Sequence, residues 1–148
     1  NQKFDYIVTK RSLINLASFK EQVKVLDKLS KLLKKNGRIL SCENSLTNLK
    51  NINKARKKVG LKKIIPPWHN VYIENTRLIN YKFKYIKFVN LHEFSSSFYF
   101  VTRVINALNS KLKKNNKFDD NINQIGYSLE QNLIPGYSQN VVFEFLKK

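Results

Sequence analysis

The chain contains no methionine, one cysteine, four glycines and three prolines among its 148 residues. The lone cysteine, Cys42, excludes a disulfide framework and fits a reducing compartment, so a cytoplasmic protein with a buried free thiol is expected. No apolar run approaches the roughly 18 residues that a membrane-spanning helix requires, which argues against a membrane span. A chain without methionine is expected to be a processed product or a piece of a longer protein.

Acidic residues are also scarce, because 10 Asp and Glu stand against 28 Lys and Arg and give a formal net charge of +18. One interpretation is a polyanionic partner such as nucleic acid or an anionic membrane surface. The other is a compositional bias, since lysine and asparagine are spread evenly along the chain. Nucleic-acid sites favour arginine and interleave aromatic residues, so the compositional interpretation is preferred. A nucleic-acid partner stays open but is not favoured.

The first 45 residues predict a strand, a helix and a second strand. Residues 4–8 form an apolar run, and Ser18 with Glu21 forms a capping box at the start of a helix. Helical spacing of apolar residues continues that helix to residue 33, and Asn36 with Gly37 predicts its left-handed end. Residues 38–43 form the next apolar strand.

The remaining chain predicts further elements separated by turns. These are a helix from about residue 46 to Gly60, a helical turn over 76–81, a strand over 85–94, a helix over 98–112, a polar surface loop over 113–123 and a closing strand over 141–146. The order indicates an α/β protein in which the first two strands are parallel neighbours and the last two pair antiparallel. The chain is treated as one domain over residues 1–148.

Several segments together resemble the C-terminal half of a class I S-adenosylmethionine-dependent methyltransferase. The letters FDYIV at residue 4 and LINL at residue 13 resemble the fourth strand of that family and the segment after it, and LKKNGR at residue 33 resembles its helix exit before strand five. Three further segments, PWHN at residue 67, FSSS at residue 94 and TRVIN at residue 102, resemble a bacterial subgroup of the family. The resemblance covers essentially the whole chain and implies a partial Rossmann-like sheet whose last two strands form an antiparallel pair.

The sequence departs from the family at the cofactor. The family holds S-adenosylmethionine with a glycine-rich loop after its first strand and an acidic residue after its second. None of the four glycines, at positions 37, 60, 126 and 136, lies in such a loop. The N-terminal cofactor-binding half is therefore expected to be absent from this chain, the edge of the 4–8 strand is expected to be bare, and cofactor binding by this part alone is expected to be weak.

The resemblance implies a site where the two parallel strands end. Thr9, Lys10 and Arg11 are expected at the methionine end of the cofactor, with an ion-pair role for Arg11 equally open. Asn15 is expected to orient substrate or to cap the following helix. Glu43 is a candidate catalytic group that would bind a substrate hydroxyl or amine, with a salt bridge to lysine as its alternative.

A lid over this site is expected from two later segments, residues 68–72 and 95–103. His69 is the candidate general base, because imidazole titrates near neutrality, although a surface role stays open. The other candidate acceptor-binding residues are Asn44, Trp68, Asn70, Tyr72, Tyr99 and Arg103. The two histidines and one cysteine have no metal-ligand spacing, so no metal is expected.

The preferred function is methyl transfer from S-adenosylmethionine to a small polar acceptor such as a saccharide. One alternative is a basic RNA-binding protein or RNA methyltransferase, and the other is a non-catalytic Rossmann-like interaction module. Polynucleotide binding that weakens steeply with salt would favour the RNA alternative. A glycine-rich loop upstream of this chain would favour an enzyme, and its absence would favour the interaction module.

Overall fold

The computed structural model describes residues 2–114, 117–130 and 133–148. The chain divides into two compact units, each assembled from separate stretches of sequence. The first comprises Asn1–Ser45, Pro66–His92 and Asn140–Lys148, and the second comprises Leu46–Ile65 and Glu93–Gln139. Part of the predicted polar loop, residues 115 and 116, lies outside the described residues.

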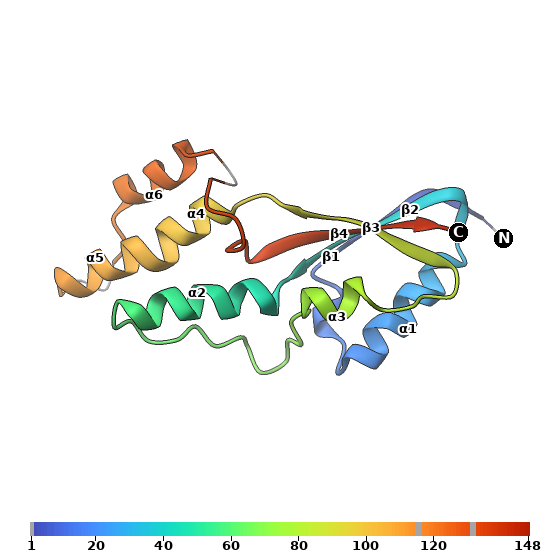
Figure 1. Cartoon of the computed structure of the whole chain (residues 1–148), viewed down its shortest axis with the longest axis horizontal. Coiled ribbons are helices and arrows are strands. Elements are labelled where there is room, and N and C mark those ends of the chain that lie inside the picture. Colours follow the sequence, from blue (N-terminus) through green and yellow to red (C-terminus); the bar gives the residue numbers. More distant parts are fainter. Residues whose placement is uncertain (1, 115–116, 131–132) are drawn as a thin grey trace. The chain divides into compact units, whose positions relative to one another are not determined.

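A four-stranded mixed sheet organises the first unit (Figure 1). Its strands are β1 (Phe4–Lys10), β2 (Leu33–Asn44), β3 (Ile86–Glu93) and β4 (Asn140–Lys147), arranged in the order β1-β2-β4-β3. The first two strands are parallel, and β4 pairs antiparallel with β2. β3 runs beside β4, and the backbone N–H of Lys148 donates to the carbonyl of Tyr85 at 3.0 Å. The predicted α/β class, the parallel first pair and the adjacent last pair are confirmed.

The core of this unit lies on one face of the sheet. Val141, Phe143 and Phe145 alternate with half-buried neighbours along β4, as expected for a strand with one covered face. The covering elements are a 3-10 turn η1 (Leu13–Asn15), helix α1 (Phe19–Ser30) and helix α3 (Asn75–Ile79) (Figure 1). Their buried contributors include Leu13, Ile14, Val23, Leu26 and Leu78.

Strand β1 is the terminal strand of the sheet and pairs with β2 alone in the part of the chain that the structure describes, as predicted. Tyr6 and Val8 lie on the face opposite the core and are 62% and 68% exposed. An apolar strand edge of this kind is prone to pair with other strands.

The structure corrects the predicted end of the first helix. The cap is as predicted, because the hydroxyl of Ser18 accepts from the backbone N–H of Glu21 at 3.3 Å. The helix ends at Ser30 instead of residue 33, and Leu33 pairs with Phe4 as the first residue of β2. Gly37 lies inside β2, where a Cβ atom would come within 3.0 Å of the carbonyl oxygens of Lys34 and Phe4. Glycine is therefore needed at that position for close backbone approach at a register shift, not for a helix end.

Helices make up the second unit. They are α2 (Leu46–Lys58), α4 (Ser96–Phe100), a π-helix η2 (Val101–Asn106), α5 (Ala107–Leu112) and α6 (Asp120–Ser128). The predicted helix over 98–112 is thus present but begins two residues earlier and contains a π-helical turn.

Helix α6 is a second correction, because its first residues fall in the predicted polar loop. The sequence of α6 is poor in strong helix formers, so side-chain contacts rather than helix propensity stabilise it. The carboxylate of Asp119 caps the backbone N–H of Asn121 at 3.0 Å, and the ring of Tyr127 stacks on Phe98 at 4.2 Å. Gly126 packs against Val101 with no room to spare, since a Cβ atom there would lie 3.2 Å from that side chain.

Candidate functional site

The carboxyl ends of β1 and β2 are joined by one buried carboxylate. Glu43 is 0% exposed, and its Oε1 accepts the backbone N–H groups of Ser12 at 3.2 Å and Leu13 at 3.1 Å. Its Oε2 accepts the backbone N–H of Ile14 at 3.3 Å. Three successive backbone N–H groups thus donate to Glu43, and its carboxylate holds the turn after β1 in place. The catalytic role expected for Glu43 is untested, but its hydrogen bonds serve the turn.

Two hydroxyl groups complete this cluster. The Oγ1 of Thr9 and the Oγ of Ser41 are 2.8 Å apart, and each lies 3.3 Å from Oε1 of Glu43. Thr9 and Ser41 are partners in the parallel register of β1 and β2, which explains why their side chains meet. Two of the predicted site residues, Thr9 and Glu43, are therefore brought together, with Ser41 as a partner that sequence patterns did not single out.

Lys10 and Arg11 project into solvent beyond this cluster. Arg11 has a left-handed backbone, with φ 51°, and its N–H donates to the carbonyl of Cys42 at 2.7 Å. The side chain of Asn15 donates to the carbonyl of Arg11 at 2.8 Å. Neither cation takes part in an ion pair among the residues that the structure describes. The ion-pair alternative for Arg11 therefore has no support here.

The loop over residues 67–72 lies against the turn after β1. The Nδ2 of Asn70 donates to Oδ1 of Asn15 at 2.8 Å, and the N–H of Val71 donates to the carbonyl of Ile14 at 2.7 Å. Gln22 connects the two segments, because its buried Nε2 donates to the carbonyls of Leu13 at 3.1 Å and Val71 at 2.8 Å. Gln22 was missed from sequence, although a polar residue beside the apolar stripe of α1 was the available signal.

Trp68 and His69 lie at the tip of this loop. Trp68 is 96% exposed, and its ring meets that of His69 edge-to-face, with centroids 5.5 Å apart. His69 is also exposed, while Tyr72 is half-buried against the core. The roles of these three residues as acceptor wall and base remain predictions.

Asn44 ends β2 with an unpaired polar atom. The residue is 1% exposed, and its Oδ1 has no hydrogen-bond partner among the described residues. Its backbone carbonyl accepts the N–H of Ile73 at 2.9 Å, which fixes the chain on that side.

The remaining two predicted residues, Tyr99 and Arg103, belong to the second unit. The guanidinium of Arg103 lies over the ring of Tyr99 at 5.4 Å and near that of Phe118 at 5.9 Å. These cation–π contacts satisfy Arg103 locally, in the absence of any acidic partner in the described ranges.

Cys42, predicted to be buried, is half-buried and unpaired. Burial is the main cause that raises the pKa of its thiol, the Glu43 charge raises it further, and Lys10 lowers it. A raised pKa leaves little thiolate near neutrality, which fits an inert thiol rather than a nucleophile.

Among residues 2–114, 117–130 and 133–148, no group of three or more His, Cys, Asp or Glu side chains gathers as a metal site. Over the same ranges, none of the helices combines the length and the apolar character that crossing a membrane demands.

Comparison with known proteins gives little further guidance. No family model matches the chain, and no curated protein matches it. Among solved structures it is similar to a protein from Galdieria sulphuraria proposed to be a sarcosine dimethylglycine methyltransferase, with 11% identity and a TM-score of 0.39. The match covers all of this chain and 54% of that protein, so the chain spans about half its length. A TM-score this low carries no argument, and the α/β fold rests on the chain's own topology.

Proposed function

We propose that this chain is the C-terminal part of a single S-adenosylmethionine-dependent methyltransferase domain that acts on a small polar acceptor such as a saccharide. The observation that carries the proposal is the strand order β1-β2-β4-β3, with β4 antiparallel beside β2. In that order β1 and β2 are neighbours and so are β3 and β4, which are the two strand pairs expected from the sequence. The order also brings Thr9, Glu43 and the 67–72 loop to one end of the parallel strands, where ligands bind in open α/β sheets.

The turn after β1 is assigned to the methionine end of the cofactor. Its two exposed cations, Lys10 and Arg11, suit a carboxylate, and Glu43 acts as a positioning residue that holds the turn beneath them. When bound, the cofactor supplies an electrophilic methyl group. The described residues fit only this end of it, because no glycine-rich loop lies among them.

The acceptor is assigned to the 67–72 loop and its neighbours. Transfer of a methyl group to a hydroxyl or amine releases a proton, which His69 is suited to accept. Trp68 and Tyr72 would supply apolar walls, and the Asn15–Asn70 pair would supply polar contacts. In the same proposal Asn44 adds a polar contact on this unit, while acceptor-binding roles for Tyr99 and Arg103 of the second unit stay predictions.

The exposed face of β1 is assigned to the rest of the domain. Tyr6 and Val8 present apolar surface at the terminal strand, which suits cover by further strands and helices of one sheet. The cofactor-binding half of the proposed domain would provide that cover.

The test uses the whole protein, S-adenosylmethionine carrying a labelled methyl group, and a panel of saccharides, polyols and small amines. Trp68→Ala is expected to lower acceptor kcat/KM by about tenfold and to leave the cofactor Kd within about twofold. Ile65→Ala, at another exposed apolar position, is the matched control and should change neither value.

Three outcomes contradict parts of the proposal. Loss of cofactor affinity in Trp68→Ala with unchanged acceptor kinetics would refute the site assignment. Absence of cofactor binding would favour the interaction module. Transfer of label into RNA, with an affinity that falls steeply with salt, would favour the RNA methyltransferase.

A further inference from the structure

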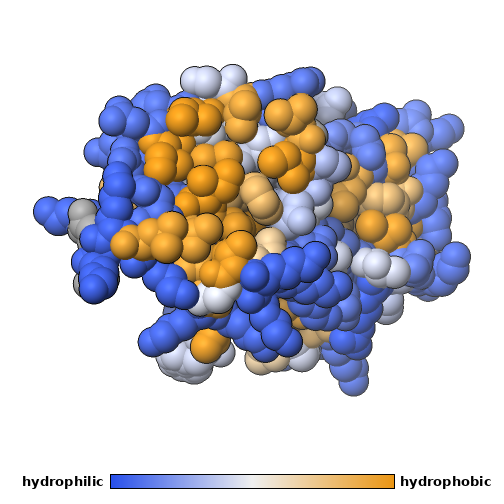
Figure 2. Space-filling model, turned by 60° about the vertical axis from the view of Figure 1, so that its left-hand side comes forward, coloured by the Kyte–Doolittle hydropathy of each residue, from blue (hydrophilic) through white to orange (hydrophobic). Residues whose placement is uncertain are grey.

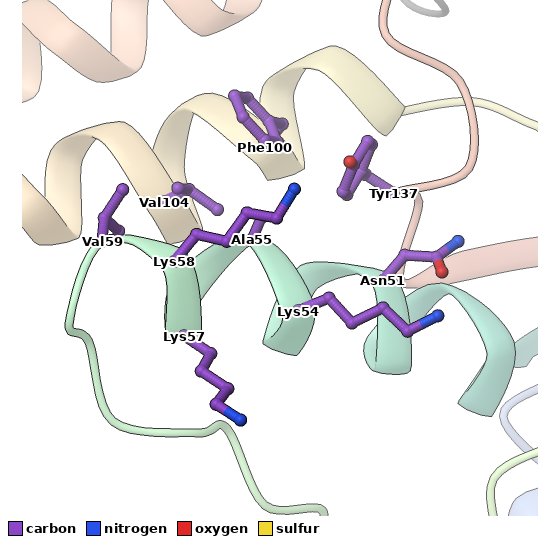
Figure 3. Close-up of a pocket in the computed structure, with 9 residues that line it drawn as sticks. All are labelled: Asn51, Lys54, Ala55, Lys57, Lys58, Val59, Phe100, Val104 and Tyr137. Atoms are coloured by element: carbon purple, nitrogen blue, oxygen red, sulfur yellow. The ribbon is translucent and has the colours of Figure 1, made fainter.

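A cavity of about 630 Å³ lies within the second unit, outside the site described above. One wall is formed by Asn51 and Ala55 of α2 and by Val59 directly after it, spaced four residues apart (Figure 3). Phe100 and Val104, four residues apart across α4 and η2, face that wall. The volume falls within the range of about 300–1,000 Å³ that is usual for small-molecule sites.

The end of the cavity is built by a well-anchored turn. Gly136 adopts a φ of 84°, which a residue with a side chain rarely adopts, and its carbonyl accepts from Nδ2 of Asn51 at 3.0 Å. The next residue, Tyr137, is held by a hydrogen bond of 2.8 Å from its N–H to Oγ of Ser96. Its ring meets Phe100 edge-to-face with centroids 4.9 Å apart. The aromatic wall is therefore fixed before any ligand binds.

The rim of the cavity carries positive charge without compensation. Lys54, Lys57 and Lys58 belong to its lining, which contains no carboxylate. None of the three takes part in an ion pair within the described part of the chain. Figure 3 shows Lys58 extending toward Phe100, whereas Lys57 points away from the cavity. The whole Leu46–Ile65 stretch contains Lys and Arg at seven positions and no Asp or Glu.

The lysines of the lining stand beside apolar side chains of Ala55, Val59, Phe100 and Val104. The face that comes forward in Figure 2 has a broad apolar area bordered by hydrophilic residues. An apolar floor with a cationic rim complements a molecule that has an apolar body and one negative end. A purely polar anion would leave the floor unused, and a neutral apolar molecule would leave the lysines unpaired.

We propose that this cavity binds a small amphiphilic anion, with its aliphatic or aromatic body between Ala55 and Phe100 and its anionic group on Lys58. The π-helical turn that contributes Val104 agrees with a binding role, because π-helical turns occur frequently at functional sites. The proposal does not depend on the methyltransferase assignment, since none of the lining residues belongs to the site proposed for that activity.

Decanoate is the probe, with decanol and decylamine as ligands that share its body but not its charge. Isothermal titration of the whole protein should show decanoate binding at one site, at least tenfold more tightly than decylamine. Ala55→Phe places a ring in the cavity and should weaken decanoate binding at least tenfold. Lys58→Gln should weaken decanoate binding by about tenfold, the usual effect of losing one charge-assisted contact, and leave decanol binding unchanged.

Two matched variants control for unspecific effects. Lys63→Gln removes an exposed lysine that follows α2 but does not line the cavity, and Ala17→Phe adds a ring at an exposed alanine of the first unit. Both should bind decanoate within twofold of the parent, and circular dichroism should show that Ala55→Phe and Lys58→Gln remain folded. If Ala55→Phe unfolds, the charge variants and the three probes still decide the question.

Three results would overturn the proposal. Equal affinity for decanoate and decylamine would remove the role of charge. Unchanged decanoate binding in both Ala55→Phe and Lys58→Gln would place the ligand elsewhere. Polyuridylate binding that Lys58→Gln and Lys63→Gln weaken equally, with no decanoate binding, would assign the basic stretch to RNA instead.

Discussion

Replacing Glu43 should collapse the turn after β1 and destabilise the fold. Its carboxylate accepts three backbone N–H groups, and those of Leu13 and Ile14 are fully buried. Glu43→Ala leaves these two donors without a partner, at about 1–3 kcal/mol each, so the free energy of unfolding should fall by roughly 2–6 kcal/mol.

Glu43→Gln gives a graded version of the same test. The amide oxygen replaces Oε1 with its backbone contacts to Ser12 and Leu13, while the amide nitrogen faces the N–H of Ile14 as a second donor. One charge-assisted hydrogen bond is lost, so a decrease of about 2 kcal/mol is expected. The control is Asp5→Asn, which removes an exposed ion pair with Lys34 and should change stability by less than about 1 kcal/mol.

Urea unfolding followed by circular dichroism measures these differences, and amide exchange of Leu13 and Ile14 localises them. The reasoning predicts the order Glu43→Ala, then Glu43→Gln, then Asp5→Asn, with faster exchange at both amides in the first two variants. A Glu43→Ala protein as stable as Asp5→Asn, with Leu13 and Ile14 still protected, would show that the carboxylate does not hold the turn.

Three further predictions concern the sheet. The pH midpoint for alkylation of Cys42 by iodoacetamide should lie above that of free cysteine, and Lys10→Gln should raise it further; a profile like that of free cysteine contradicts this. The pKa of Glu144 is lowered chiefly by its hydrogen bond with His92, so its stabilisation is present above the unfolded-state pKa and is lost as pH falls through the folded-state pKa. The stability difference between the parent and Glu144→Gln should therefore shrink in urea titrations as the pH falls below the ordinary glutamate pKa of about 4.3, and a constant difference would exclude this linkage. Gly37→Ala should lower the free energy of unfolding by about 1–3 kcal/mol in the same assay, because the new Cβ meets backbone oxygens. An unchanged free energy would mean that β1 and β2 can move apart at this position without cost.

Sequence patterns that act within a few residues predicted the start of α1 but not its end. The cap formed by Ser18 and Glu21 marked the start of α1, because this pattern acts over a few residues. The end of α1 was predicted wrongly because Leu33 fits the helical stripe equally well. Pairing with Phe4, which is distant in sequence, decides its conformation.

The site was predictable only in part for the same reason. Parallel strands place Thr9 and Glu43 at one edge, and that much follows from the order of elements. The convergence of three backbone N–H groups on Glu43 and the bridge made by Gln22 depend on how distant segments pack. Helix α6 was missed because Asp119, Tyr127 and Gly126 stabilise it through contacts rather than through helix propensity.

The division into two units has a consequence for dissecting the protein. The backbone passes from one unit to the other four times, after Ser45, Ile65, His92 and Gln139. No single cut in the chain can therefore release either unit intact, and no continuous stretch of the gene encodes one of them. Subcloning either unit would require new peptide connections between residues 45 and 66 and between 92 and 140, or between 65 and 93, so rearranged chains rather than truncations are the route to studying each unit separately.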